Sequence, residues 1–225
     1  LARLREVLAK AAGGERQIVF VTGEPGIGKT ALIEAFVTGN RQQAMGNGDQ
    51  ARQKAKSKKQ KPVLGAAEGA KIEGSAFSTF FSTQSSVLST PDFLLGWGQC
   101  IEQYGVGEPY MPVLEALGRL CRGSAGKQLV KCLQQHAPTW LTQMPAVLST
   151  TELQALQPRV LGATRERMLR ELAEALEILT AEQTLILVLE DLHWADVSTL
   201  ELLAALARRR ESARMLVIGA YRPTE

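Results

Sequence analysis

A glycine-rich octapeptide, G-E-P-G-I-G-K-T at residues 23–30, separates a short apolar run from a stretch rich in helix-forming residues. The preceding residues 18–21 (IVFV) predict a buried strand, and residues 31–37 (ALIEAFV) predict a helix. Strand, G-x-x-x-x-G-K-[ST] and helix in this order are the pattern of a phosphate-binding P-loop, and here the flanking segments agree with the motif. The alternative is an ordinary glycine-rich turn that happens to carry a lysine.

The octapeptide has the residue types that a triphosphate requires. Glycines let the backbone turn tightly and approach the phosphates, and the N-terminal end of the following helix favours negative charge. In such a loop Lys29 reaches the β- and γ-phosphates, and the Thr30 hydroxyl is a ligand of Mg²⁺. The predicted nucleotide-binding residues are Gly23, Glu24, Pro25, Gly26, Ile27, Gly28, Lys29 and Thr30.

A second candidate site follows the apolar run at residues 185–189 (LILVL). A continuous apolar run is typical of a parallel strand that is covered on both faces, and this one ends in Glu190-Asp191. Acidic residues at the end of a central strand are where a P-loop fold holds its magnesium. We assign Glu190 to Mg²⁺ and Asp191 to the attacking water as base, although the two roles can be exchanged. A solvated acidic strand end is the alternative.

Two nearby positions have structural explanations. Asp196 precedes a helix-forming stretch and is predicted to cap its N-terminus. His193, beside Trp194, is expected to shape the loop rather than to contact a phosphate. With His136 the only other histidine and no Cys/His cluster, the sequence does not predict a zinc site.

A third apolar run, residues 215–220 (MLVIGA), is followed by Tyr221-Arg222-Pro223. An arginine at the end of a strand beside the acidic strand can reach the γ-phosphate and so distinguish ATP from ADP. Arg222 is therefore a candidate catalytic residue, together with Lys29, Glu190 and Asp191. The alternative is a surface arginine before a turn.

Three segments together resemble the bacterial STAND-type AAA ATPases of LuxR-type (MalT-like) transcriptional regulators and of proteins with cyclase or kinase domains. They are V-L-E-D-L-H-W-A-D at residues 188–196, G-Q-C-I-E-Q-Y-G-V-G-E-P-Y-M-P at 98–112, and G-A-Y-R-P at 219–223. The resemblance spans residues 1–38 and 96–225. It implies an α/β fold of the P-loop NTPase class, a three-layer αβα sandwich with a mainly parallel sheet, without the helical lid and winged helix that members carry.

The resemblance also implies a function. Members bind ATP with Mg²⁺, hydrolyse it slowly and couple the nucleotide state to the assembly of attached effector domains in a longer cytoplasmic protein. By motif position Gly23, Gly28, Lys29 and Thr30 are phosphate and Mg²⁺ residues, Glu190 and Asp191 are the Walker B pair, and Arg222 is the sensor arginine. The resemblance further implies that the domain binds ATP or ADP and associates with other copies of itself in a nucleotide-dependent way.

Residues 39–95 differ from the rest of the chain. Between Gly39 and Pro62 there are seven basic residues and one acid, and a Ser-, Thr- and Phe-containing stretch follows. We expect a low-complexity, disordered insertion, with a basic arm for an acidic partner as the alternative. The rest of the chain has 19 basic and 22 acidic residues, so no broad nucleic-acid surface is expected. No apolar stretch approaches the roughly 20 residues of a bilayer span.

The remaining elements are predicted from periodicity and breakers: a helix over 1–12, a strand over 98–104, a helix starting at Pro112 and one helix over 159–181. Residues 126–157 predict short helices separated by prolines. Arg208-Arg209-Arg210 would end a helix and complement its dipole, with an arginine finger as the alternative.

Two other functions stay open: a nucleotide-binding scaffold or inactive fragment without turnover, and a P-loop small-molecule kinase. A kinase would need an arginine-rich lid, and no such segment is present in the sequence. The guanine-reading N-K-x-D and the transporter signature L-S-G-G-Q do not occur either, which disfavours a GTPase and an ABC ATPase.

Overall fold

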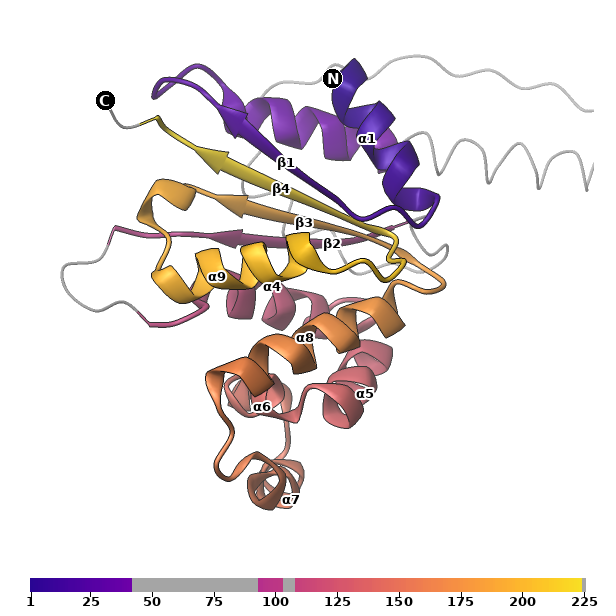
Figure 1. Ribbon diagram of the computed structural model, residues 1–225, viewed down its shortest axis with the longest axis vertical. Coiled ribbons are helices and arrows are strands. Elements are labelled where there is room, and N and C mark those ends of the chain that lie inside the picture. The colour runs from indigo at the N-terminus through magenta and orange to yellow at the C-terminus, as the bar shows by residue number, and fades with distance from the viewer. Residues whose placement is uncertain (42–92, 103–107, 224–225) are drawn as a thin grey trace, which may run out of the picture. The chain divides into compact units, whose positions relative to one another are not determined.

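Four strands form one parallel sheet in the order β1-β4-β3-β2 (Figure 1). The computed structural model describes residues 1–41, 93–102 and 108–223. The strands are β1 (Gln17–Thr22), β2 (Phe93–Gln99), β3 (Thr184–Glu190) and β4 (Met215–Tyr221), and each neighbouring pair is parallel. Because helices cover both faces, the predicted α/β sandwich of the P-loop class is confirmed.

One face of the sheet is covered by α1 (Ala2–Ala12) and by the helix after the glycine loop, residues 29–41. Leu4 and Ala11 of α1 and the buried side chains of the second helix meet alternate residues of the central strands. This smaller cluster consists of Leu4, Ala11, Ile33, Phe36, Val37, Phe93, Ile186, Val188, Leu216, Ile218 and Ala220.

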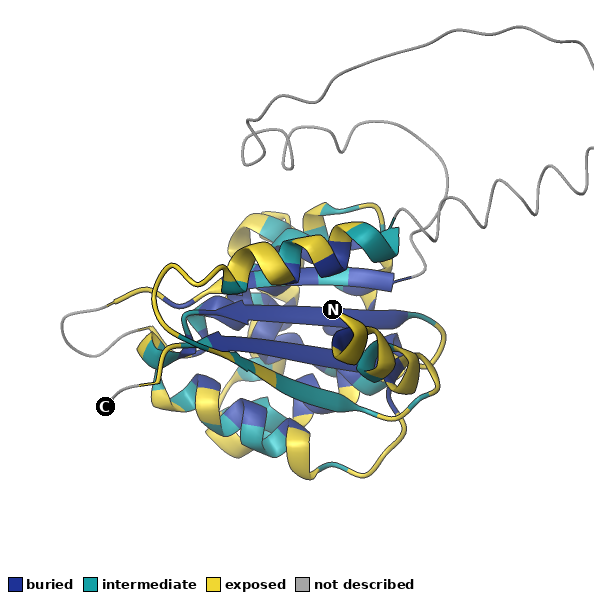
Figure 2. Ribbon diagram, turned by 90° about the horizontal axis from the view of Figure 1, so that it is seen from above, coloured by how far each residue is buried: buried dark blue, intermediate teal, exposed yellow. Residues whose placement is uncertain are grey.

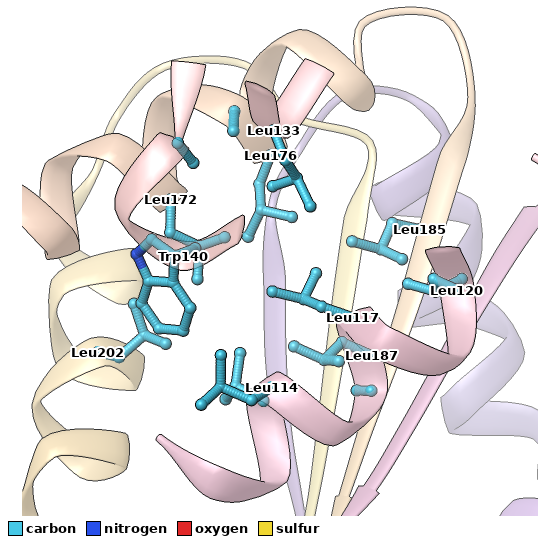
Figure 3. Packing of buried hydrophobic residues seen from close by; sticks show 14 of the residues in the cluster. Leu114, Leu117, Leu120, Leu133, Trp140, Leu172, Leu176, Leu185, Leu187 and Leu202 are labelled. Atoms are coloured by element: carbon cyan, nitrogen blue, oxygen red, sulfur yellow. The ribbon is translucent and has the colours of Figure 1, made fainter. Parts of the chain in front are cut away.

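The opposite face carries the rest of the helices. Their bounds are α4 (Met111–Arg122), α5 (Gly126–His136), α6 (Pro138–Thr142), η1 (Pro145–Val147), α7 (Thr150–Val160), α8 (Arg165–Leu179), η2 (Leu192–Trp194) and α9 (Val197–Arg208). Leucines of α4, α5, α8 and α9 form one cluster with Trp140 of α6 and with Leu185 and Leu187 of β3 (Figure 3). Only 5% of the residues in the sequence are aromatic, and the core is accordingly mainly aliphatic.

Burial differs between the strands. Every residue of β3 and all but the last of β4 are buried, which explains their continuous apolar sequences (Figure 2). The prediction that residues 18–21 form a buried strand is correct for the strand and wrong for the burial: β1 is only half-buried, and Phe20 is 56% exposed. The reason is position, because among the described residues β1 pairs with β4 alone.

Strand β2 lies tightly against the start of α4. A Cβ on Gly98 would lie 1.8 Å from the Pro112 carbonyl oxygen, so only glycine permits this approach. Arg119 of α4 also donates a hydrogen bond to the Trp97 carbonyl at 3.3 Å. These contacts hold β2 against α4, while its parallel pairing with β3 brings Gln99 opposite Glu190.

Two predicted elements are corrected. The second strand spans Phe93–Gln99, and not residues 98–104. The single helix expected over residues 159–181 is divided between α7 and α8: Gly162 has a φ of 69°, and Thr164 caps α8 by accepting a hydrogen bond from the Arg167 N–H. The apolar periodicity of α8 continued into the preceding turn and concealed this break.

Contacts divide the chain into a unit of Leu1–Val37 with Asp92–Glu225 and a unit of Thr38–Pro91. The prediction of a disordered insertion at 39–95 falls mostly on residues 42–92, outside the described residues, while the structure assigns 93–95 to β2. Within the described ranges, no helix combines the length and the apolar character that a membrane span requires.

Candidate functional site

The glycine loop connects β1 to the helix at residues 29–41. Its three glycines, Gly23, Gly26 and Gly28, have φ angles of 153°, 77° and 89°. A Cβ on Gly26 or Gly28 would meet nothing within 4 Å, so glycine is required here by backbone rotation and not by crowding. Positive φ angles at nearby loop residues are the backbone conformation from which anion-binding nests are built.

Lys29 lies in the first turn of this helix, and its side chain folds back over the loop. The Nζ atom donates hydrogen bonds to the carbonyl oxygens of Gly23 at 2.7 Å and Glu24 at 3.0 Å. The ammonium group is held by neutral acceptors, so its full positive charge remains available to an anion at the loop. Leu32 N–H bonds to the Gly28 carbonyl at 2.9 Å, which places the start of the helix directly behind the loop.

Glu190, the last residue of β3, directly contacts the helix at residues 29–41, which we call the P-loop helix. The Thr30 hydroxyl donates to Glu190 Oε1 at 2.5 Å, and Trp97 Nε1 of β2 donates to Glu190 Oε2 at 2.9 Å. Only 9% of Glu190 is exposed. The structure therefore brings Glu190 into contact with Thr30, the neighbour of Lys29, although Thr30 and Glu190 are 160 positions apart in the chain.

Asp191 is directed differently from its neighbour. It has a left-handed backbone (φ 53°, ψ 42°) and starts the short helix η2. Its Oδ2 atom accepts a hydrogen bond from Gln99 Nε2 at 3.0 Å. Trp97 thus binds Glu190 and Gln99 binds Asp191, and these two donors are two residues apart on β2. Each carboxylate is therefore oriented by its own partner.

The residues after the acidic pair form the expected turn. Asp196 caps α9: its carboxylate accepts from Thr199 N–H at 2.9 Å, and it also accepts from Tyr110 N–H at 3.3 Å. The His193 ring lies 5.1 Å from the Trp194 ring, and its two buried nitrogens have no hydrogen-bond partner in the described part of the chain. Asp196 is confirmed as a helix cap, and it also links α9 to the start of α4.

Arg222 follows β4, whose neighbours are β1 and β3. In the sheet register Tyr221, the last residue of β4, lies opposite Thr22, the last residue of β1. Arg222 therefore follows its strand at the same end of the sheet as the P-loop, where the carboxyl ends of the strands lie. Its residue is exposed and makes no hydrogen bond or ion pair with the other residues that the structure describes. The topology thus places this arginine between the two strands that carry the other candidate residues.

The arginine run at 208–210 lies at the end of α9, shortly before β4 begins. It is therefore near the amino ends of the strands, at the opposite end of the sheet from the P-loop. Arg209 donates to Glu177 Oε1 and Oε2 at 2.7 Å each, and Arg16 donates to Oε1 at 2.7 Å. Burial acts to raise the pKa of Glu177, but the bonds from Arg209 and Arg16 outweigh it and the pKa is lowered. Arg209 is therefore part of an ion cluster that joins α8 to the residue before β1 and to the residue after α9.

Comparison with known proteins adds the family. A family model described as an AAA ATPase domain matches residues 1–218, nearly the whole chain. The chain belongs to this family. No curated protein and no solved structure matched the ATPase domain in the corresponding searches.

The donor set of this ATPase domain fits a magnesium nucleotide. The Thr30 hydroxyl uses its hydrogen on Glu190, which leaves its oxygen lone pairs free for a cation. Among the described residues, no three His, Cys, Asp or Glu side chains gather as a metal site. A Mg²⁺ ion takes one or two protein ligands and completes its shell with phosphate oxygens and water, so the Thr30 oxygen and the Glu190 carboxylate fit such a site.

Two residues of the site were not predicted from sequence: Trp97 and Gln99. Both lie on β2 and donate to the acidic pair. Gln99 falls within the segment that resembles the STAND ATPases, but its role depends on β2 lying beside β3. Polar side chains two residues apart near the end of a strand are the one signal in the sequence, and it does not say which strand is adjacent.

Proposed function

We propose that this AAA ATPase domain binds ATP with Mg²⁺ at the P-loop and hydrolyses it slowly. The observation that carries the proposal is the 2.5 Å hydrogen bond between Thr30 and Glu190. It joins the first turn of the P-loop helix to the end of the acidic strand, and a magnesium nucleotide requires these two elements together. The positive φ angles of the loop glycines and the position of Lys29 support the same site.

Each residue has a distinct part in this proposal. The loop N–H groups and Lys29 bind the phosphates, and Thr30 with Glu190 holds Mg²⁺. When bound, the magnesium ion neutralises charge on the phosphate oxygens. Asp191, which is held apart from Glu190 by Gln99, orients the attacking water and accepts its proton. Arg222 reaches the γ-phosphate from the end of β4.

We further propose that the domain is the nucleotide-dependent switch of a STAND-type bacterial signalling or transcriptional regulator that acts in the cytoplasm. The support is the resemblance of residues 98–112, 188–196 and 219–223 to that group of ATPases. In this proposal ATP and ADP favour different assembly states, and effector domains in a longer chain respond to them. Direct binding of nucleic acid by this domain is not part of the proposal.

The test uses the full chain with a matched lysine control. Calorimetry measures Mg·ATP binding and a phosphate-release assay measures turnover, for the wild type, Lys29→Ala and Lys131→Ala. Lys131 is an exposed lysine of α5, so its replacement removes the same charge away from the site. We expect Lys29→Ala to lose binding and turnover, and Lys131→Ala to retain both.

Three outcomes separate the alternatives. Binding without phosphate release in the wild type would establish a nucleotide-binding scaffold in place of an ATPase. Transfer of phosphate to an added small-molecule acceptor would establish a kinase. No binding of Mg·ATP by folded wild-type protein, or equal binding by Lys29→Ala, would refute the proposed site.

A further inference from the structure

The carboxylate of Glu190 is held at two points by donors from two different elements. Oε1 accepts from the Thr30 hydroxyl of the P-loop helix at 2.5 Å, and Oε2 accepts from Trp97 Nε1 of β2 at 2.9 Å. With both oxygens bonded and only 9% of the residue exposed, the carboxylate has one orientation. That orientation turns Oε1 toward Thr30, the residue to which we assign the magnesium ion.

Trp97 is itself fixed by its surroundings. It pairs with Val188 in the β2–β3 register, and its side chain packs against the smaller core cluster, which includes Val188. Its carbonyl accepts from Arg119 of α4, and the next residue, Gly98, lies against Pro112. The contacts of β2 with α4 and of the indole with the smaller core cluster therefore place the indole N–H beside Glu190.

The chemistry of an indole suits this task. It donates one hydrogen bond, accepts none through nitrogen and carries no charge. It can orient Glu190 without neutralising it, whereas an arginine or lysine in this place would compete with the cation for the negative charge. It also occupies Oε2, so the carboxylate presents Oε1 alone toward the loop.

We propose that Trp97 is a positioning residue of the magnesium site: its indole N–H sets the orientation of Glu190, and through Glu190 the affinity for Mg²⁺. This inference rests on the proposed function. It differs from a structural role for the tryptophan because it assigns the effect to a single hydrogen bond and predicts that the effect depends on the Glu190 carboxylate.

The first test replaces Trp97 by phenylalanine, which keeps an aromatic ring and removes the donor. We expect the Mg²⁺ concentration for half-maximal ATP binding to rise about tenfold, as for other residues that hold metal ligands. Magnesium-free nucleotide binding should change less than about twofold. Trp194→Phe is the matched control, because Trp194 is also an aromatic residue near the acidic pair, is 43% exposed and does not bond to Glu190.

A double-mutant cycle separates positioning from packing. With Glu190→Gln as background, Trp97→Phe should have little further effect on the Mg²⁺ requirement, because the charge that the indole orients is gone. If the tenfold loss persists in that background, packing is its cause and the proposal is refuted. An unchanged Mg²⁺ requirement for Trp97→Phe in a wild-type background also refutes it.

A spectroscopic test needs neither nucleotide nor metal. The chain has three tryptophans, and the indole N–H resonance of Trp97 is the one that Trp97→Phe removes from the NMR spectrum. Glu190→Gln should shift this resonance and leave that of buried Trp140 in place, and an unshifted resonance contradicts the hydrogen bond. If the wild type does not bind Mg·ATP, the proposed function and the inference are refuted together. If the wild type binds Mg·ATP, the inference alone is refuted when Glu190→Gln leaves the Trp97 resonance unshifted or when Trp97→Phe leaves the Mg²⁺ requirement unchanged.

Discussion

The ion cluster around Glu177 offers a strong test of how the sheet is held together. The Glu177 side chain is 13% exposed, and the Arg16 side chain is 6% exposed. Arg16 also donates to the carbonyls of Leu206 and Arg209 at 3.0 and 3.2 Å, where α9 ends. Replacing Glu177 by alanine leaves a buried arginine without its charge partner, and breaking a buried pair costs about 3–5 kcal/mol.

We take the lower end, about 3 kcal/mol, because Arg209 is 26% exposed and can be partly rehydrated. For a chain of this size each kcal/mol corresponds to about 2–4 °C, so Tm should fall by about 6–12 °C. Thermal unfolding followed by circular dichroism measures this change, and urea unfolding gives the free energy directly.

Glu174→Ala is the matched control on the same helix. Glu174 lies 4.0 Å from Arg170 in an exposed i,i+4 pair, with the two side chains 49% and 63% exposed. Such pairs contribute about 0.5 kcal/mol or less. If Glu177→Ala costs no more than Glu174→Ala, the reasoning from burial is wrong.

The contribution of Glu177 also has a defined pH dependence. Its pKa is lower in the folded protein than the usual value of about 4.3, because the bonds from Arg209 and Arg16 outweigh its burial. The stabilisation is therefore complete above about pH 4.3 and is lost as the pH falls through the folded pKa. The stability difference between wild type and Glu177→Ala should shrink only under these acidic conditions.

Two further predictions concern the site. Gly28→Ala forces an L-residue to a φ of 89°, so the free energy of unfolding in urea should fall by about 1–2 kcal/mol and Mg·ATP binding should weaken. The control Gly118→Ala replaces a glycine inside the helix α4 and should not lower stability. Equal stabilities of the two variants would contradict the argument from backbone strain at Gly28. Burial, and then the charges of Asp196 and Asp191, raise the pKa of the Cys100 thiol to about 12, so peptide mapping after alkylation at pH 8 should find Cys100 unmodified until urea unfolds the chain. Rapid alkylation of the folded protein would contradict this.

Much of the fold could be predicted because local patterns match what the tertiary structure requires. The runs at 185–189 and 215–220 are apolar throughout, since parallel strands covered on both faces bury every side chain. The same reasoning overestimated the burial of β1, where Phe20 is 56% exposed. An apolar strand reads alike at the centre and at the side of a sheet, so sequence alone does not reveal its neighbours.

The errors at β2 and α7–α8 have different physical causes. Strand β2 contains Gly96 and Gly98, and glycines inside a strand weaken its signal in the sequence, so the pattern predicts a start at Gly98 in place of Phe93. Gly162 turns with a φ of 69° between two helices whose apolar residues continue the same spacing. A single glycine in an otherwise periodic stretch is a weak signal, because helices tolerate it at a cost of about 1 kcal/mol.

For the candidate site, local sequence determined the glycine loop, the lysine and threonine that follow it, and the acidic end of an apolar strand. These are short-range features, because backbone rotation at glycine and the termini of elements depend on a few neighbouring residues. Only the tertiary structure decided that Glu190 meets Thr30 and that Trp97 and Gln99 hold the two acids. The order β1-β4-β3-β2 brings these residues together, and strand order depends on the packing of the whole chain.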